Sequence, residues 1–210
     1  MKFHDEILSA AQRQVLPKLG PFATQQGFYL AGGTAVALYL GHRESVDFDW
    51  FARGEVEDPL VLAGLAQEQG LPLENPQTSA GTLHVVVGGV RVSFFRYPYA
   101  EISMPSKCEE YSADLASLDD LACMKLGAIA QRGSRKDFID LYFLANEHKP
   151  IAELVALYRR KYAVRDIVPV LTGLGYFDDA ETEPPPVMIR EISWEKIKRA
   201  CADWSRSLAG

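Results

Sequence analysis

The chain has 210 residues, of which 48% are hydrophobic and 24% charged, and this is enough to bury one sizeable core or a core with a helical appendage. Its formal net charge of −6 argues against a protein that coats nucleic acid through a broad positive field, so no broad DNA binding is expected. The longest apolar run, residues 28–40, is interrupted by Gly32-Gly33-Thr34 and is shorter than the about 20 residues of a membrane span. We therefore expect no membrane association, and because no leader sequence is found we expect no export.

The cysteines and histidines indicate a reducing compartment and no zinc or iron site. The cysteines are odd in number and form no C-x-x-C, which favours buried reduced thiols. The histidines are scattered and show no ligand spacing. We therefore expect a cytoplasmic protein. The residues concerned are Cys108, Cys123, Cys201, His4, His42, His84 and His148.

The first 41 residues predict the order helix, strand, turn, helix. Apolar residues at helical intervals predict an amphipathic helix over about residues 4–18, ended by Gly20-Pro21. A short strand is expected at 28–30 and a turn at Gly32-Gly33-Thr34. A helix should then cover 35–40 and end at Gly41.

The next segment predicts a second strand and a hairpin. Alternating residues predict a strand at 45–51, and Asp58-Pro59 supplies an N-cap and first-turn proline for a helix to about Gly70. After a polar loop, Gly88-Gly89 between 82–87 and 90–95 is typical of a two-residue β-hairpin. These strands should be antiparallel neighbours.

The second half of the chain predicts helices. Ser117 can cap one that ends before Gly133, Ser134 can cap a second to about residue 146, and further helices are expected at 151–164 and 193–208. The fold class expected is therefore α/β (α+β): a mixed sheet with flanking helices over residues 1–112, followed by a helical domain over 113–210 that completes the site.

Two carboxylates stand in the strand predicted at 45–51. Asp47 and Asp49 project from one face, while Val46, Phe48 and Trp50 take the other. Two bare charges about 6 Å apart repel by about 3 kcal/mol at an effective dielectric of 20, and Mg²⁺ or Mn²⁺ with a bound NTP would neutralise them. From the D-x-D pair alone, a polar outer face of a half-exposed strand is the favoured explanation.

The preceding glycine turn favours the first interpretation. Two glycines between a strand and a helix N-terminus allow the backbone to approach an anion such as phosphate. A glycine turn, a short helix and then D-x-D resembles the nucleotidyltransferase superfamily related to DNA polymerase β. In that superfamily a G-[GS] turn precedes a strand with two metal-binding aspartates.

The resemblance extends beyond this motif, over roughly residues 25–147. Four segments resemble the AbiEii/AbiGii toxin family, also called DUF1814. They are Leu-Ala-Gly-Gly-Thr-Ala from Leu30, the stretch from Gly41 to Asp49, Lys125-Leu126, and Arg-Gly-Ser-Arg-Lys-Asp-Phe-Ile-Asp-Leu-Tyr from Arg132. The resemblance implies a nucleotidyltransferase core with a helical half, and nucleotide transfer by toxins of toxin–antitoxin or phage-defence systems, in some cases to the tRNA 3′ end.

The resemblance also implies roles for individual residues. Asp47 and Asp49 would bind Mg²⁺, and Lys125 would reach the triphosphate. Asp137 and Asp140 match the family's second acidic pair, with Asp137 orienting a lysine or the nucleotide. The nucleotide-binding residues expected are Gly32, Gly33, Thr34, Lys125, Arg132 and Lys136, and the catalytic residues are Asp47, Asp49, Lys125 and Asp137.

Further basic residues are weaker candidates for phosphate binding. Arg135 belongs to one cluster with Arg132 and Lys136, and Arg43 lies near the aspartates in sequence. A second cluster comprises Arg159, Arg160, Lys161 and Arg165. Taken alone, each cluster is more often a solvated surface than a binding site.

One position departs from the superfamily pattern. Ser93 stands where many members carry a third carboxylate that acts as general base. A serine cannot take a proton at neutral pH, so the enzyme uses another means or is inactive. His84 should face Ser93 across the hairpin and is a hypothetical substitute.

Together with its resemblance to the AbiEii family, the sequence predicts a Mg²⁺-dependent nucleotidyltransferase; the resemblance implies a toxin that transfers NMP from NTP to an RNA, tRNA included, or to a protein. A cognate antitoxin is an expected partner. The alternatives are a non-catalytic nucleotide- or protein-binding module that lost the third carboxylate, and an enzyme that modifies a small antibiotic-like acceptor.

Overall fold

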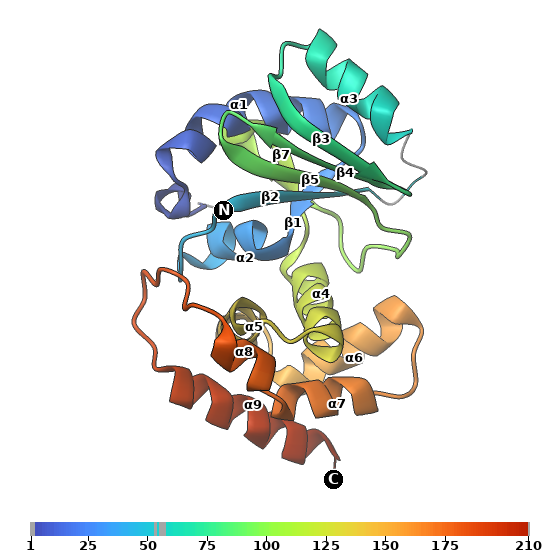
Figure 1. Ribbon diagram of the computed structural model, residues 1–210. Helices are drawn as coiled ribbons and strands as arrows, with labels where there is room; N and C mark the ends of the chain where they lie inside the picture. Colours follow the sequence, from blue (N-terminus) through green and yellow to red (C-terminus); the bar gives the residue numbers. More distant parts are fainter. Residues whose placement is uncertain (1–2, 53, 55–57, 210) are drawn as a thin grey trace.

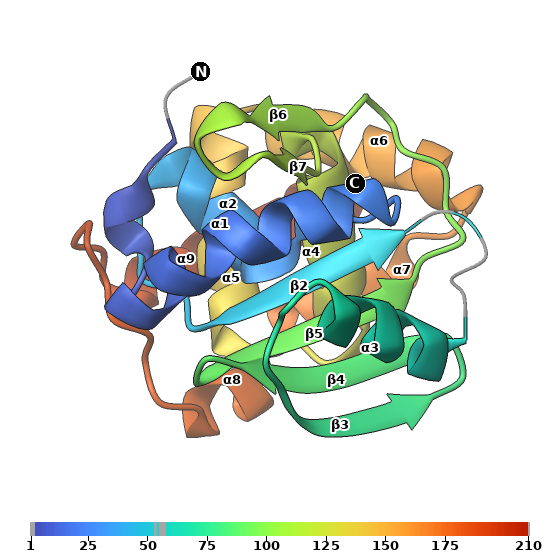
Figure 2. The same ribbon diagram turned by 90° about the horizontal axis from the view of Figure 1, so that it is seen from above.

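The computed structural model describes residues 3–52, 54 and 58–209. A sheet with helices α1 and α3 over its outer face forms one half, and helices α4 to α9 form the other half (Figure 1). Seen from above, α1 and α3 lie across the sheet with the helical half behind it (Figure 2). Helix α2 contacts both β2 and helices α4 and α5, so it joins the two halves.

The sheet is seven-stranded and mixed, with the order β3-β4-β5-β2-β1-β7-β6. Strand β2 runs antiparallel to β1 and parallel to β5, and β1 runs parallel to β7. The α/β fold class is therefore confirmed. The strands are β1 (Tyr29–Ala31), β2 (Asp47–Ala52), β3 (Leu73–Ser79), β4 (Thr82–Val87), β5 (Val90–Arg96), β6 (Ser106–Cys108) and β7 (Ala113–Leu115).

Capping side chains at the N-termini and a glycine at one C-terminus mark the ends of several helices. Ser9 forms a capping box before α1, Asp58 caps α3, Ser117 caps α4, and Gly41 ends α2 in the left-handed conformation. The helices are α1 (Ala10–Gln25), α2 (Gly32–Leu40), α3 (Pro59–Glu68), α4 (Leu118–Gln131), α5 (Arg135–Glu147), α6 (Ile151–Tyr162), α7 (Val168–Gly175), α8 (Asp178–Thr182) and α9 (Trp194–Ala209). None of the helices in the described ranges is long and apolar enough to cross a membrane.

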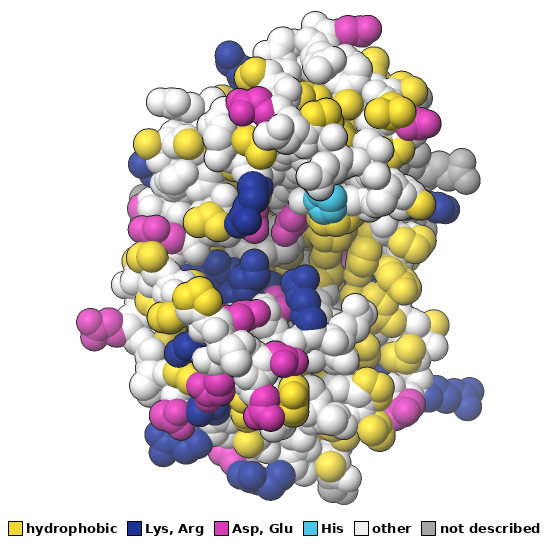
Figure 3. All heavy atoms as spheres, viewed as in Figure 1, with side chains coloured by type: hydrophobic (Ala, Val, Ile, Leu, Met, Phe, Trp, Pro, Cys, Tyr) yellow, Lys and Arg dark blue, Asp and Glu magenta, His cyan; other side chains and the backbone are white. Residues whose placement is uncertain are grey.

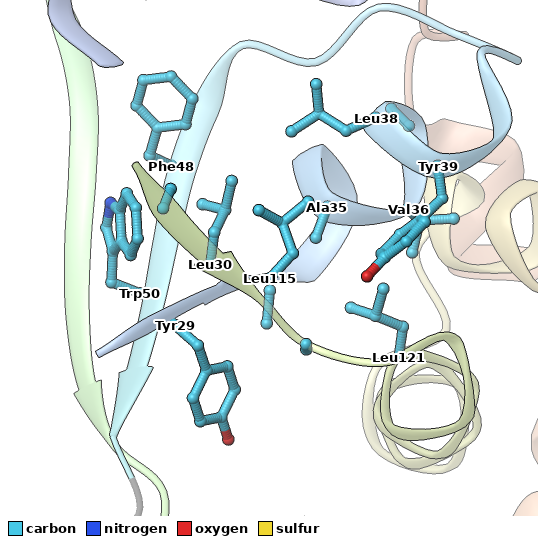
Figure 4. Close-up of a cluster of buried hydrophobic side chains, with 14 of the residues drawn as sticks. Tyr29, Leu30, Ala35, Val36, Leu38, Tyr39, Phe48, Trp50, Leu115 and Leu121 are labelled. Carbon is cyan, nitrogen blue, oxygen red and sulfur yellow. The ribbon is translucent and has the colours of Figure 1, made fainter. Parts of the chain in front are cut away.

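The core holds β1, β2, β7 and α2 together. Leu30 and Trp50, which are partners in register, are fully buried, and so is Phe48 (Figure 4). Val36 of α2 lies in the same cluster. Burial of these large side chains contributes about 1.5–3 kcal/mol each, so both β2 and α2 are held rigidly. Val46, expected on this buried face, is instead exposed and lies just before the strand.

Two sequence predictions of the first half are wrong. Helix α1 does not end at Gly20-Pro21 but continues to Gln25. Gly20 is a packing position, because a Cβ there would lie 2.3 Å from the Tyr111 carbonyl oxygen. The expected turn at Gly32-Gly33-Thr34 is already the first turn of α2, with Gly32 at φ +64°.

The polar segment expected as a loop contains the edge strand β3. Its residues are mostly exposed, and the register with β4 shifts between Glu74 and Gln77, around Pro76. A proline is tolerated at an edge strand or bulge. The hairpin at Gly88-Gly89 is confirmed with the expected register, including His84 opposite Ser93. Strand β7 lies in the sheet at residues 113–115, and the division into two domains stays a prediction.

Candidate functional site

A pocket of about 400 Å³ lies between the sheet half and the helical half. Figure 3 shows a hollow at this level, with basic side chains gathered on its helical side and acidic, basic and histidine side chains together on its sheet side. The lining residues include Gly32 at the start of α2, Phe51 of β2, and Lys125 and Arg132 at α4. The pocket thus brings together segments that are about one hundred residues apart in the sequence.

The two aspartates of β2 lie on the sheet face opposite to its buried side chains. Asp47 and Asp49 are half-buried, whereas Phe48 and Trp50 between and after them are fully buried. Burial, and then the charge of Asp47, raise the pKa of the Asp49 carboxyl. Two like charges in this setting are uncompensated by a direct ion pair among the described residues, so the site favours a cation.

The start of α2 is shaped around Asp49. Gly32 has a left-handed backbone, and a Cβ at that position would lie 2.7 Å from Asp49 Oδ2. Only glycine therefore lets the aspartate and the helix start approach this closely. The first N–H groups of α2 and its dipole lie beside the pocket, where they favour an anion.

Gly33 and Thr34 contribute to the framework under the site. A Cβ at Gly33 would collide with the Arg43 guanidinium, so this glycine leaves room for a buried charge. Thr34 is buried; its hydroxyl donates to the Asp47 carbonyl oxygen at 2.5 Å and lies 2.6 Å from Ser45 Oγ. Thr34 thus attaches α2 to the start of β2 through its side chain.

Lys125 lies at the centre of a buried ion network. Its Nζ donates to Asp137 Oδ1 at 2.9 Å and pairs with Asp140 Oδ2 at 2.7 Å, and both aspartates are fully buried. Burial opposes the charged form of Lys125, but the two carboxylates outweigh it and raise its pKa. Burial likewise opposes ionisation of Asp137, yet Lys125 and Arg132 lower its pKa. Lys125 therefore presents a fixed positive charge at the pocket wall.

Arg43 and His42 complete this network from the loop after α2. Arg43 donates Nε and Nη2 to the two oxygens of Asp140 at 2.7 and 2.8 Å, and it is buried. His42 Nε2 donates to Asp140 Oδ1 at 2.7 Å, and burial lowers the pKa of His42, so its ring is neutral. Against burial, Arg43 and Lys125 hold the pKa of Asp140 well below its usual range. Arg43, a weaker candidate for phosphate, instead fixes Asp140.

The basic residues before and at the start of α5 divide into two groups. Arg132 lines the pocket and its Nε lies 3.3 Å from Asp137 Oδ2, and Lys136 is exposed. The charges of Lys136 and Arg132 act on Asp49 across the pocket. Arg135 instead donates its N–H to Glu183 and lies over the Trp194 ring, so it ties α5 to the last helices.

Aromatic side chains form the other end of the pocket and were missed from the sequence. Ring centroids lie 5.3 Å apart for Phe51 and Tyr97, 5.0 Å for Tyr97 and Tyr99, and 4.7 Å for Tyr99 and Tyr162. Tyr158 also lines the pocket. These residues come from β2, the segment after β5, and α6, so only the Tyr97-Pro-Tyr99 spacing signalled them in the sequence. An aromatic wall of this kind suits a planar heterocycle.

A second ion pair holds the segment that carries the tyrosines. Asp120 accepts hydrogen bonds from the Ile102 and Ser103 N–H groups, and Lys161 Nζ donates to it at 2.7 Å. Lys161 is buried, so it belongs to the framework and not to an exposed basic cluster.

The donor set fits a hard divalent cation. No group of three or more His, Cys, Asp or Glu side chains with ligand geometry occurs in the part of the chain that the structure describes. Mg²⁺, however, is usually held by one or two carboxylates together with water and substrate phosphates. Asp47 and Asp49, with the raised pKa of Asp49, supply such an incomplete site.

The chain is similar in sequence to known proteins. The family model described as "Nucleotidyl transferase AbiEii toxin, Type IV TA system" matches residues 15–204. "Uncharacterized protein aq_aa25" of Aquifex aeolicus (strain VF5) is 37% identical over 192 residues, which is 91% of this chain and 92% of that protein.

Solved structures show the same fold at low identity. JHP933 from Helicobacter pylori superposes with a TM-score of 0.59 at 14% identity, covering 96% of this chain and 93% of that one. The nucleotidyltransferase toxin MenT4 from Mycobacterium tuberculosis gives 0.53 at 14% identity, covering 90% and 81%.

Proposed function

The chain belongs to the AbiEii nucleotidyltransferase toxin family, and from that premise we propose that it is a Mg²⁺-dependent enzyme that transfers a nucleoside monophosphate from an NTP to an RNA acceptor. The observation that carries this proposal is the arrangement across the pocket. Asp49 of β2 feels the charges of Lys136, Lys125 and Arg132 of the helical half, and the start of α2 at Gly32 closely approaches it. A triphosphate with a divalent cation fits between these opposite charges.

The two ends of the pocket suit the two ends of a nucleotide. Lys125, Arg132 and Lys136 would hold the triphosphate beside Gly32, whose lack of a side chain admits it. The base would lie against the aromatic wall, where stacking on one side chain is worth about 1–3 kcal/mol. The pocket of about 400 Å³ falls in the usual size range of small-ligand sites.

The proposed chemistry relies on positioning and charge. Asp47 and Asp49 would hold the metal ion, which when bound neutralises the phosphate oxygens and activates the attacking hydroxyl. Lys125 cannot move freely, because Asp137 and Asp140 fix it, so its charge is in place before the nucleotide enters. Such preorganised charges are the main source of catalysis in phosphoryl transfer.

An RNA acceptor is favoured by the surface beside the pocket. Arg159, Arg160 and Arg165 are exposed near Tyr158 and Tyr162, which line it. Clustered arginines at the mouth of a site bind phosphates of a nucleic acid even on an acidic protein. A tRNA is one RNA of this class, and transfer to a protein is an outcome that the experiment below would detect.

The proposed biological role is that of a toxin in a toxin–antitoxin or phage-defence system, because the matched family and MenT4 are described as toxins. A cognate antitoxin protein is then the expected partner. The three free cysteines are buried, which suits the reducing cytoplasm that we propose as its location.

The experiment is transfer of label from each of the four α-labelled NTPs to total RNA and to total cell protein, with Mg²⁺ or with EDTA. We expect label on RNA with Mg²⁺ and none with EDTA. The Asp47→Asn variant should transfer none, while Asp203→Asn, which changes an exposed carboxylate on α9, should match the wild type. NTP binding without transfer to either acceptor would support the non-catalytic module instead.

A further inference from the structure

A row of polar side chains crosses the sheet face next to the metal-binding aspartates. Asp49 pairs in register with Ser93 of β5, Ser93 with His84 of β4, and His84 with Gln77 of β3. Because the side chains of paired residues point to the same face, all four project toward the same side of the sheet as Asp47. A separate pocket of about 330 Å³ lies over this row.

This second pocket is distinct from the one with the aromatic wall. Its lining includes Asp47, Gln77, His84, Arg91 and Ser93, whereas none of these residues lines the first pocket. Asp47 lines the second pocket, and Gly32, which closely approaches Asp49, lines the first. An acceptor in the second pocket would therefore meet the nucleotide's α-phosphate at the aspartates.

The transfer step needs a group that takes the proton of the attacking hydroxyl. Asp47 and Asp49 are committed to the metal ion in the proposed function. Ser93 and Gln77 do not accept a proton at neutral pH, and Arg91 is a permanent cation. His84 is the side chain of the row whose neutral form offers a nitrogen lone pair to a proton.

Ser93 positions the ring of His84. His84 Nδ1 lies 3.0 Å from Ser93 Oγ, and the His84 ring packs edge-on against Phe95 at a centroid distance of 5.6 Å. In the neutral tautomer with its proton on Nδ1, the ring donates to Ser93 Oγ, and Nε2 keeps the lone pair. The serine hydroxyl, which can also donate, therefore holds the orientation of the ring and is compatible with this tautomer.

We propose that the pocket over this row receives the acceptor hydroxyl and that His84 Nε2 takes its proton. This inference rests on the proposed function. In the step, the acceptor oxygen forms a bond to the α-phosphorus while its proton moves to Nε2. The bond from the α-phosphorus to the bridging oxygen breaks, and pyrophosphate leaves with that electron pair. The imidazolium later releases the proton to solvent.

Charged groups around His84 support this assignment. Arg91, the register partner of Asp47, lies on the same face and lines the pocket, where it would bind a phosphate of the acceptor. On the edge strand, Glu74 pairs with Val86, which lies one row away from His84. The positive charge of Arg91 favours an acceptor that carries phosphate, as an RNA does, over a polycationic small molecule.

The test begins with His84→Ala, which changes an exposed side chain. We expect kcat to fall by about 10²- to 10⁴-fold, as for loss of a general base, with the Kd for the NTP unchanged. Added imidazole should restore part of the turnover, because the pocket has room for it. His148→Gln, which changes a histidine at the end of α5, is the matched control and should leave kcat unchanged.

A second variant keeps the test sharp. In the His84→Ala background, Ser93→Asp should restore turnover, since it returns a proton acceptor to the next position of the row. Full turnover by His84→Ala, or a loss of turnover that neither imidazole nor Ser93→Asp restores, would overturn the inference. In either case, transfer by the wild type would still support the proposed function. Absence of transfer by the wild type would overturn both.

Discussion

Replacing Asp49 by asparagine should stabilise the metal-free protein and abolish transfer. Asp47 and Asp49 lie two residues apart on one face of β2, at about 6.5–7 Å along the strand. At an effective dielectric of 20, two unit charges at this distance repel by about 2.5 kcal/mol. Both residues are half-buried, so water reduces this, and we expect a gain of about 1–2 kcal/mol.

The cations across the pocket do not cancel this effect. Lys136, Lys125 and Arg132 lower the pKa of Asp49, yet burial and Asp47 outweigh them and the net pKa is raised. An acid with a raised folded-state pKa stabilises the fold fully below its unfolded pKa of about 3.9 and loses that contribution as the pH rises through the folded value. The higher stability of Asp49→Asn relative to the wild type should therefore be absent near pH 4 and fully present at neutral pH.

The assay is thermal and urea unfolding of the two proteins in EDTA, repeated with Mg²⁺ and a non-hydrolysable NTP analogue. In EDTA at neutral pH, Asp49→Asn should melt higher by about 2–8 °C, from about 2–4 °C per kcal/mol for a chain of this size. The ligands should then raise the melting temperature of the wild type more, because it binds them and the variant does not. A variant less stable than the wild type in EDTA, or an equal gain from ligands, would refute the reasoning.

Three further predictions concern the framework and the pocket. Lys125→Met removes the cation that Asp137 and Asp140 share, so the free energy of unfolding, measured in urea, should fall by about 3–5 kcal/mol. Burial lowers the pKa of His42, so at mildly acidic pH the unfolded state binds a proton that the folded state does not. The free energy of unfolding should therefore decline as the pH falls below about 6.5. His42→Gln should reduce this dependence of stability on pH, and an equal dependence in both proteins would contradict the prediction. Tyr99→Ala should raise KM for the NTP by about 5- to 150-fold, equivalent to about 1–3 kcal/mol of stacking. The melting temperature should not change, because the Tyr99 side chain is 42% exposed. An unchanged KM would show that the nucleotide base does not stack on the aromatic wall.

Features with local physical signals were predictable from the sequence. Gly88-Gly89 between two alternating runs determined the hairpin and its register, so Ser93 and His84 were expected to be partners and are. Asp47 and Asp49 were expected on one strand face for the same reason, because alternation in a strand needs no knowledge of distant residues.

Features that depend on distant contacts were not predictable. The Arg43 pair with Asp140 joins residues 97 positions apart, and no local pattern indicates that this arginine is buried. The family resemblance placed Thr34 at the phosphates, and no local pattern indicates that its hydroxyl donates to the Asp47 carbonyl oxygen where α2 packs on β2. Strand β3 forms by pairing with β4 despite a polar sequence without alternation, so tertiary pairing overrides its local propensity.

The most direct measurement of the central claim uses one NTP labelled in parallel at the α- and the γ-phosphate, with Mg²⁺, purified protein and total RNA. If the pocket positions a triphosphate for nucleotidyl transfer, the α-label should appear on RNA and the γ-label should appear only in released pyrophosphate. The Asp47→Asn variant should neither label the RNA nor release labelled pyrophosphate. Transfer of the γ-label to RNA or protein, or release of label from the γ-position alone as inorganic phosphate, would contradict the account.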